Sequence, residues 1–407
     1  MKYKFLLPCL VLVGNSCLAY GGVTVFGVLD ASVTHYRVAA GSAQGLHLPG
    51  SSQTVLANGA NTASRLGFKG VEDLGGGLSA GFWLEAPLSN DNGSAVTRPF
   101  NFSRRATVSL LSSMGELRLG RDNTPTDWND VIFSPFGPQS VGSSMTLQVA
   151  GVNMSGRSQL PGDVNAVRAS NTLGYFLPKN SLGIYGQAMY AFDETADNRK
   201  PTYPEDLVQL QRKKSRYMGA RLGYKSGPLD VAASAGWSDL GDPVGARRIS
   251  GNEFAHFGAR VRTINFGASY DWRWMRLMGE WSDVRTSYWE ASTTGRPLPS
   301  FDTTVSRSWV FGGVIPVGRN DVKFSYSQLH VRMPADLGIE SPKFQKLTIG
   351  GIHNFSKRTA AYASLAYLKN SHGAALPAGG SGNSLVPIKG VPNANATGFE
   401  MGLRHAF

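Results

Sequence analysis

The sequence has almost no cysteine. Its 407 residues include two, Cys9 and Cys17, and both lie in the N-terminal segment. The remainder of the chain therefore has no thiol with which to form a disulfide or a paired cysteine metal site. This distribution excludes a scaffold held together by disulfides.

Long hydrophobic runs are also missing. Beyond the N-terminal segment, no stretch approaches the ~20 consecutive apolar residues that a membrane-spanning helix needs. Charged residues make up only 17% of the chain, whereas glycine occurs 49 times and hydrophobic residues make up 42%. This composition fits many short strands joined by turns better than it fits helices.

The common linear motifs of catalysis are absent. The sequence has no H-E-x-x-H metal motif, no G-x-S-x-G nucleophile elbow and no phosphate-binding P-loop. The formal net charge is +12, but the basic residues are scattered singly rather than clustered on helices or interleaved with stacking aromatics. We therefore predict no catalytic residues, no metal or cofactor site and no nucleic-acid partner.

The N-terminal segment has the pattern of a secretory signal peptide. Lys2 and Lys4 form a positive start, an apolar run over 5–13 follows, and Cys17-Leu18-Ala19 supplies a small-residue cleavage site. The apolar run is too short for a transmembrane anchor. We expect a signal peptide over 1–19, with cleavage after Ala19, and a single domain over 20–407.

Segments in which polar and apolar residues alternate recur along the rest of the chain. Alternation with a period of two is typical of β-strands whose two faces meet different surroundings. We predict sixteen strands, at 22–37, 62–71, 78–88, 100–112, 116–123, 170–179, 182–193, 215–226, 229–239, 262–272, 275–287, 305–316, 320–331, 343–355, 358–370 and 397–407.

The connections between these strands alternate in length. Connections after even-numbered strands are short and rich in turn residues, while those after odd-numbered strands are mostly long. An even number of strands, with short turns at one end and long loops at the other, is typical of a transmembrane β-barrel. We expect outer loops at 38–61, 194–214, 240–261, 288–304, 332–342 and 371–396.

The longest interruption, at 124–169, follows the fifth strand. Its prolines and glycines, among them Pro125, Pro135 and Gly137, indicate a folded loop with local turns rather than a linker. A barrel of sixteen strands is wide enough to hold an aqueous channel. We expect this loop to fold into the lumen and narrow it.

The last predicted strand runs to the final residue, Phe407, with no turn after it. On one face it carries Phe399, Met401, Leu403, His405 and Phe407, and on the other Glu400, Gly402 and Arg404. A large aromatic at the end of a strand indicates a terminus that is tied into a sheet at an apolar boundary. A closed barrel in lipid supplies both conditions.

Several motifs resemble those of the Gram-negative general porins. They are SRLGFKGVEDLGGG at 64–77, GFWLE at 81–85, RRATV at 104–108, GELRLGR at 115–121 and LRHAF at 403–407. The pattern looks most like that of the anion-selective porins of beta-proteobacteria. The resemblance extends from the first strand to Phe407 and is most specific over 64–121.

This resemblance implies an all-β fold, a sixteen-stranded antiparallel barrel in the outer membrane. It implies a homotrimer whose third loop, 124–169, folds inward and whose second loop, 89–99, reaches a neighbour. It also implies that Phe407 belongs to the signal read by the outer-membrane assembly machinery. The expected partners are membrane lipid, lipopolysaccharide and small anionic solutes. The third loop departs from many relatives at SPFG, 134–137, which lacks their acidic residue before Phe-Gly and so puts the charge of the constriction in question.

Candidate pore residues follow from the resemblance together with strand alternation. Porins of this kind carry a cluster of arginines at the constriction, and the matching positions here are Arg65, Arg104 or Arg105, and Arg168. Alternation along the strand favours Arg105 as the lumen-facing residue, whereas the family motif favours Arg104. Alternation also directs Glu85 inward, where we expect it to pair with one of the arginines.

Other charged residues are weaker candidates for the pore lining. Lys69, Arg118 and Arg121 extend the basic track along the wall. Asp127 and Asp130 of the long loop are candidates for an opposing acidic side, although simple solvation of the loop explains them equally well. The constriction candidates Arg65, Arg104 or Arg105, and Arg168 each also have a plainer interpretation as part of a solvated salt bridge in the barrel wall.

The sequence thus predicts passive diffusion of small hydrophilic solutes with a preference for anions. Guanidinium groups remain charged at every relevant pH and offer a planar set of donors to carboxylate, phosphate or sulfate. A ring of like charges in a narrow lumen concentrates anions and repels cations. Two alternatives remain open: an outer-membrane barrel enzyme, whose Ser/His or Asp/His pair escapes a linear motif search, and a surface adhesin that uses the long loops.

Overall fold

A computed structural model describes most of the chain. It covers residues 22–43, 45–93, 100–147, 167–192, 216–240, 247–250, 253–292, 303–333, 340–379 and 389–407. The predicted signal peptide at 1–19 and the predicted outer loop at 194–214 lie outside these residues. So do residues 94–99 of the predicted second loop and 148–166 of the predicted third loop.

The described residues form an almost entirely β structure in which α1 is a short helix. The elements are β1 Thr24–Val38, β2 Gly41–Ala43, β3 Leu46–Leu48, β4 Ser51–Asn58, β5 Arg65–Gly75, β6 Leu78–Pro87, β7 Arg105–Ser112, β8 Gly115–Asn123, α1 Pro125–Ile132, β9 Arg168–Phe176, β10 Ile184–Ala191, β11 Arg216–Ser226, β12 Leu229–Leu240, β13 Arg247–Ser250, β14 Glu253–Asp271, β15 Arg276–Ser292, β16 Thr304–Val317, β17 Asn320–Arg332, β18 Lys343–Asn354, β19 Thr359–Ser371 and β20 Ala396–Ala406.

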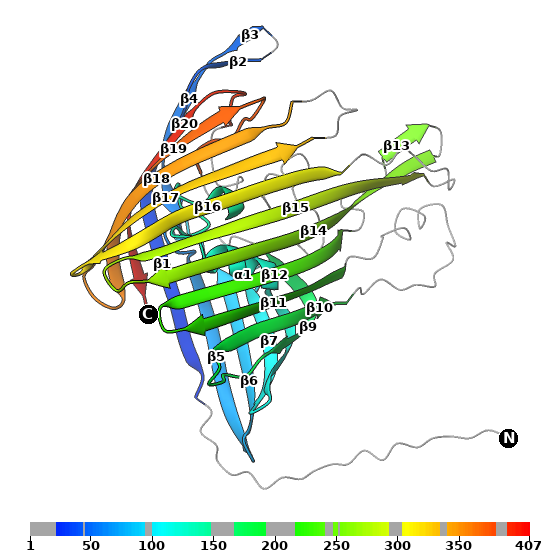
Figure 1. Cartoon of the computed structure of the whole chain (residues 1–407), viewed down its shortest axis with the longest axis vertical. Coiled ribbons are helices and arrows are strands. Elements are labelled where there is room, and N and C mark those ends of the chain that lie inside the picture. The colour runs from blue at the N-terminus through cyan, green and yellow to red at the C-terminus, as the bar shows by residue number, and fades with distance from the viewer. Residues whose placement is uncertain are drawn as a thin grey trace, which may run out of the picture.

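These strands close into a barrel in which each strand is antiparallel to its neighbours (Figure 1). The last strand, β20, pairs with the first, β1, from Val28↔Ala406 to Val38↔Ala396. Two consecutive strands, β4 and β5, lie one after the other along β1, and β13 pairs with β14 alone. Counted across the wall, the described strands therefore form a barrel of sixteen. The predicted strand number and fold class are confirmed.

The regular structure extends further into the predicted outer loops than the sequence suggested. Strands β2, β3 and β4 lie within the segment predicted as loop 38–61, and β14 begins at Glu253 rather than at 262. The β14–β15 pair continues as far as Ala255↔Ser292. Figure 1 shows the β2–β3 hairpin and β13 projecting beyond the wall. Once a hairpin leaves the lipid, neither face has to be apolar, so strand alternation no longer reveals it.

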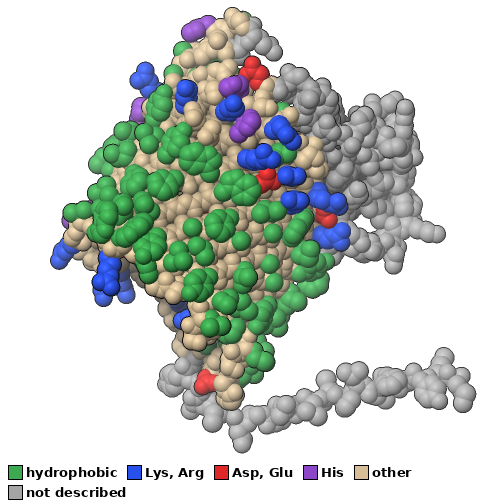
Figure 2. Space-filling model, in the orientation of Figure 1, with side chains coloured by type: hydrophobic (Ala, Val, Ile, Leu, Met, Phe, Trp, Pro, Cys, Tyr) green, Lys and Arg blue, Asp and Glu red, His purple; other side chains and the backbone are tan. Residues whose placement is uncertain are grey.

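The outer face of the wall is apolar and its inner face is polar, which is the reverse of the arrangement in a soluble barrel. On β1, Leu29 and Val33 are 40% and 49% exposed, whereas Asp30 and Thr34, which directly follow them, are fully buried. The same arrangement recurs on the other strands, so the outer surface carries a broad hydrophobic band (Figure 2). The polar side chains face the interior, as expected of a wall whose outside is in contact with lipid.

The seam between the first and last strands is closed at the final residue. The backbone groups of Phe407 and Gly27 exchange two hydrogen bonds of 3.1 Å. A Cβ atom at Gly27 would clash with the ring of Phe407 and would lie 2.8 Å from the carbonyl oxygen of Arg65. The absence of a side chain at Gly27 therefore lets the aromatic terminus lie on β1.

Helix α1 was not predicted and begins the long connection between β8 and β9. Thr124 caps it by accepting a hydrogen bond of 3.3 Å from the backbone N–H of Asp127, and Pro125 occupies the first turn. Both are common at helix N-termini. Among the described residues, no helix has the length and apolar character required to cross a membrane.

Candidate pore constriction

The first part of the long loop is bound to the inner face of β12 and β14. The Asn129 side chain donates hydrogen bonds to the carbonyl of Ala232 at 3.2 Å and to Oδ1 of Asn265 at 3.0 Å. Asn265 in turn donates to the carbonyl of Thr126 at 3.0 Å. Both asparagines are fully buried. These amide contacts hold α1 against the wall inside the barrel.

The next part of the loop reaches strands β17, β18 and β20, which lie further along the sheet. Glu400 accepts a hydrogen bond from Ser140 and one of 2.9 Å from the backbone N–H of Val141. Lys346 donates to the carbonyls of Ser143, at 2.9 Å, and Gly379, at 3.1 Å. Residues 124–147 therefore lie across the lumen, which confirms the inward-folded third loop over its described part.

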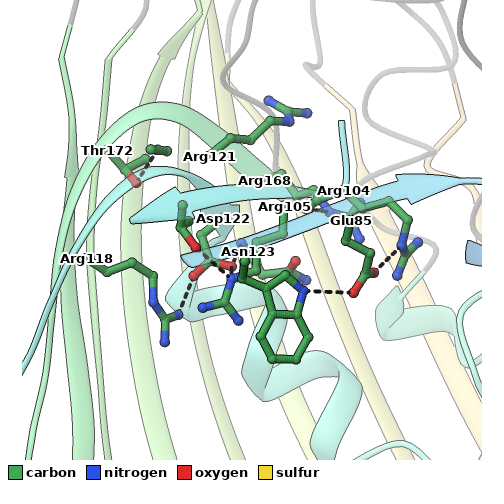
Figure 3. A network of polar contacts seen from close by, with 12 residues as sticks. Glu85, Arg104, Arg105, Arg118, Arg121, Asp122, Asn123, Arg168 and Thr172 are labelled. Atoms are coloured by element: carbon green, nitrogen blue, oxygen red, sulfur yellow. Dashed lines mark hydrogen bonds and ion pairs between the residues drawn. The ribbon is translucent and has the colours of Figure 1, made fainter. Parts of the chain in front are cut away.

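Arginines gather on the wall next to this loop, on β5 to β9 (Figure 3). The Nε atom of Arg104, which directly precedes β7, lies 2.5 Å from Oε1 of Glu85, and the Nε atom of Arg65 lies 3.7 Å from the same oxygen. The indole of Trp83 donates to the other oxygen of Glu85 at 3.3 Å. Glu85 thus links the start of β5 to the start of β7.

The second arginine of the double-arginine motif lies on the same side. The Nε atom of Arg105 donates to Oγ1 of Thr107 at 3.1 Å and lies 3.9 Å from Oδ1 of Asp122. Its guanidinium is 4.5 Å from the centroid of the Trp83 ring. Asp122 also binds the guanidinium of Arg118. The structure therefore brings both Arg104 and Arg105 to the inner face.

Arg168 joins this group from the first residue of β9. Its Nε atom donates to the carbonyl of Arg104 at 2.9 Å. Asp127 of α1 is electrostatically coupled to Arg168 and accepts a hydrogen bond of 2.6 Å from Asn123. Burial raises the pKa of the Asp127 carboxyl to about 6, although the nearby Arg168 and Arg104 act to lower it. An acidic group of the long loop thus faces the basic wall.

Lys69 extends the basic surface toward the short-turn end of the barrel. Its Nζ atom lies 5.0 Å from the centroid of the Trp83 ring and 5.3 Å from that of Phe26. Together with Arg105 it leaves this part of the wall positive, with an aromatic ring between the two cations.

Two of the weaker candidates bind partners other than Glu85 and Asp122. The guanidinium of Arg121 binds the carbonyl of Ser103 at 2.6 Å and Oγ of Ser170 at 2.7 Å, and in Figure 3 it points away from Glu85. The carboxylate of Asp130 accepts a hydrogen bond of 2.8 Å from Asn265 of β14. The structure therefore does not bring Asp130 to the arginines.

Sequence reasoning missed several residues that hold this group of arginines and the inward-folded loop in place. Asp122 pairs with two arginines, and its alternation in step with Arg118 along β8 is the signal that would have identified it as inward-facing. Lys346 and Glu400 are buried charges that bind the loop. Strand alternation predicts that both side chains point inward. It cannot predict their partners in the loop, because those partners lie more than 200 residues away in the sequence.

The group as a whole is rich in positive charge. Its cations are Arg65, Lys69, Arg104, Arg105, Arg118 and Arg168, and its carboxylates are Glu85, Glu116, Asp122 and Asp127. The cations outnumber the carboxylates, so the electrostatic potential at this part of the wall is positive. No set of three or more potential metal ligands occurs among the described residues.

Comparison with protein families finds a match over most of the chain. The model of a family described as Gram-negative porin matches residues 9–373. The chain is 32% identical over 409 residues to outer membrane porin protein 32 of Delftia acidovorans, with 100% of both chains covered. It is 27% identical to an outer membrane porin protein of Bordetella pertussis, over 99% of this chain and 100% of that protein.

Solved structures show the same relationship. The anion-selective porin from Comamonas acidovorans superposes with a TM-score of 0.73 at 30% sequence identity, over 95% of this chain and 100% of the other. An outer membrane protein of Vibrio cholerae, solved in trimer form, superposes with a TM-score of 0.61 at 14% identity, over 95% of this chain and 99% of that one. The second likeness is one of fold alone.

Proposed function

Because this chain belongs to the Gram-negative porin family, whose members are channels of the outer membrane, we propose that its barrel passes small hydrophilic solutes by passive diffusion and prefers anions. The proposed constriction consists of Arg65, Arg104, Arg105 and Arg168 with Glu85, next to the inward-folded loop. A relative of 30% identity is named as an anion-selective porin, which supports this preference.

The observation that carries the proposal is the excess of fixed positive charge beside the loop. Glu85 can balance the charge of only one of its two arginine partners, Arg65 and Arg104. Arg168 donates to the backbone carbonyl of Arg104, a neutral acceptor that does not cancel the charge of its guanidinium. Guanidinium groups held by these contacts keep their positions in the wall. A permeating anion then meets several weak binding sites in succession rather than one tight pocket, so it can enter and leave.

The test is the reversal potential of the purified protein in a planar bilayer under a KCl gradient. We expect the sign that corresponds to chloride permeating faster than potassium. The preference should weaken as salt rises, because the screening length falls to ~3 Å near 1 M. A cation-selective or silent channel would contradict the proposal.

We infer that the protein assembles as a homotrimer. The resemblance to trimeric porins motivates this, and the Vibrio cholerae relative in fold was solved in trimer form. Crosslinking of the unheated protein should give a ladder that ends at three subunits. A ladder that ends at one or two subunits would contradict it.

We propose no catalytic role. In the described part of the chain, the histidine rings with side-chain hydrogen bonds contact Thr54, Asn320 and Thr359 rather than a serine or a carboxylate. A hydrolase dyad or triad needs a base bonded to the nucleophile. The purified protein should therefore show no esterase or peptidase turnover, and measurable turnover would overturn this view.

We also propose that Phe407 is part of the signal read by the assembly machinery. Phe407 is 44% exposed while its backbone closes the seam with Gly27. The Phe407 side chain is not buried within the barrel, so a receptor can contact it. Deleting Phe407 should lower the fraction of protein that reaches the outer membrane, with the folding of purified protein in detergent as the control.

A further inference from the structure

A glycine leaves an open place on the inner face of the wall, on the short-turn side of the proposed constriction. Gly81 of β6 lies two residues before Trp83 and so shares its face. Cross-strand pairing places Val71 of β5 and Ser109 of β7 on either side of Gly81. A Cβ atom at Gly81 would lie 3.3 Å from Cδ1 of Leu111 and 3.7 Å from Cγ2 of Val71. Two aliphatic side chains therefore flank a position that has no side chain of its own.

This position is the floor of a pocket of about 530 Å³ that extends across β1, β5, β6, β7 and β8. A volume of this size is typical of sites for small molecules. The lining combines the apolar groups Val71, Leu111 and Trp83 with the cationic groups Lys69, Arg105 and Arg118. Val71 alternates in step with Lys69 and is 60% exposed, so its apolar surface is open to a solute. Such a surface is unusual here, because the interior face of a porin wall is polar.

Two of the cations keep charge that a solute can use. The Nζ atom of Lys69 lies 5.0 Å from the ring centroid of Trp83 and 5.3 Å from that of Phe26, and among the described residues it forms no ion pair with a carboxylate. The Nε atom of Arg105 lies 3.9 Å from Oδ1 of Asp122, which is longer than a hydrogen bond. Both side chains can therefore bind the carboxylate of a solute.

We propose that this pocket binds a small aromatic carboxylate on its way through the channel. The carboxylate contacts Lys69 and Arg105. The ring lies over Gly81, between Val71 and Leu111, where it removes apolar surface from water. A ring at this position also presents its π-electrons to the cations of the pocket. The inference rests on the anion-passing function proposed above, to which it adds a class of anion.

The apolar floor separates this class of anion from others. An aliphatic dicarboxylate must keep both of its charges hydrated or paired, so it cannot lay much apolar surface on Val71 and Leu111. A neutral aromatic solute gains the apolar contacts but no ion pair, and an inorganic anion gains the ion pair alone. An aromatic carboxylate uses both kinds of contact.

The test is the concentration of benzoate that halves the chloride current of the purified protein in a planar bilayer at low salt. Bound benzoate places a negative charge beside Lys69 and fills part of the lumen, so the current should fall as the pocket saturates. Succinate and the neutral solute benzyl alcohol are titrated in parallel. We expect little block by benzyl alcohol, because it has no charge for the cations to bind.

The variant Gly81→Val fills the floor of the pocket and keeps every charge. It should raise the half-blocking concentration of benzoate roughly tenfold. The value for succinate should stay as in wild type, since succinate interacts with the charges alone. The matched control Gly351→Val adds the same side chain to β18, where the nearest atom to a Cβ would be the carbonyl oxygen of Asp321 at 3.5 Å. Both solutes should block this control as they block wild type.

A second variant, Val71→Thr/Leu111→Asn, keeps the pocket open and makes its two flanks polar. It should also weaken the block by benzoate roughly tenfold, with no change for succinate. Heat-modifiable mobility on gels shows for each variant whether the barrel has folded, so the test remains decisive if Gly81→Val folds poorly.

Three outcomes would overturn the proposal. The first is an unchanged half-blocking concentration of benzoate in either folded pocket variant. The second is a shift for succinate as large as that for benzoate, which would indicate a general change of the pore. The third is block by benzyl alcohol as strong as that by benzoate. The reversal potential is measured in KCl alone, so failure of anion selectivity and failure of benzoate binding are distinguishable.

Discussion

The carboxylate of Glu85 accepts a hydrogen bond of 2.5 Å from the Nε atom of Arg104. The backbones of the same two residues are also joined, since the N–H of Arg104 donates to the carbonyl of Glu85 at 3.1 Å. This double contact fixes the arginine at the point where the chain enters β7. Glu85 therefore both positions a pore arginine and cancels part of its charge.

Replacing Glu85 with Gln should make the channel more anion-selective. The amide keeps an acceptor for Arg104 but removes one negative charge from the lumen. One unit charge at close range in a wet site changes the permeability ratio of chloride to potassium by roughly fivefold at low salt. Reversal potentials measure this ratio. Asp239→Asn, which removes the same charge from the outer surface, should leave it unchanged.

Replacing Arg65 and Arg168 with Gln should shift permeability toward cations. Both side chains belong to the proposed constriction, and the double variant removes two of its fixed positive charges. Reversal potentials under a KCl gradient should move toward the potassium equilibrium value. Lys357→Gln, in an exposed short turn, serves as the control. Unchanged selectivity in the double variant would reject these two assignments.

Selectivity should depend on pH through Asp127. Its pKa is raised to about 6 by burial, so the carboxyl is charged above that pH and neutral below it. As pH falls through about 6, a negative charge beside Arg168 is lost and the anion preference should increase. Asp127→Asn should show the higher preference at neutral pH and no transition near that pKa. A transition that persists in this variant would assign the effect to another group.

Replacing Lys346 with Met should loosen the inward-folded loop. The buried ammonium binds the carbonyls of Ser143 and Gly379, and leaving buried carbonyls without donors costs about 1–3 kcal/mol each. Single-channel recordings should show more frequent flickering at similar ion selectivity. Lys343→Met, on the opposite face of β18, is the control and should record like wild type.

Replacing Gly27 with Val should hinder closure of the barrel. Any side chain there meets the ring of Phe407 and the carbonyl oxygen of Arg65, so β20 cannot settle against β1. We expect a lower yield of folded protein, measured as the fraction with heat-modifiable mobility on gels. Gly22→Val is a matched control, since a Cβ atom at Gly22 has no neighbour within 4 Å. Equal yields would show that the seam tolerates the side chain.

The sequence by itself determined the strands and the direction of most side chains. The two-residue period is a local property of a strand, so the inward direction of Glu85 and Glu400 was readable without a structure. Strand segments that extend beyond the lipid, such as β4 and the start of β14, were missed because no membrane requires one of their faces to be apolar, so their sequences need not alternate. Helix α1 was missed because its eight residues are fewer than the roughly 11–18 over which a helical period can be recognised in a sequence.

Only the tertiary structure decided which charges meet. The pairing of Arg104 and Arg65 with Glu85, the contact of Lys346 with Ser143 and the opposition of Arg262 to Arg285 all join separate segments. Cross-strand register and the path of the inward-folded loop set these partners, and neither follows from alternation along one strand. The sequence thus identified a barrel with inward arginines, and closure of the barrel determined how their charge is balanced.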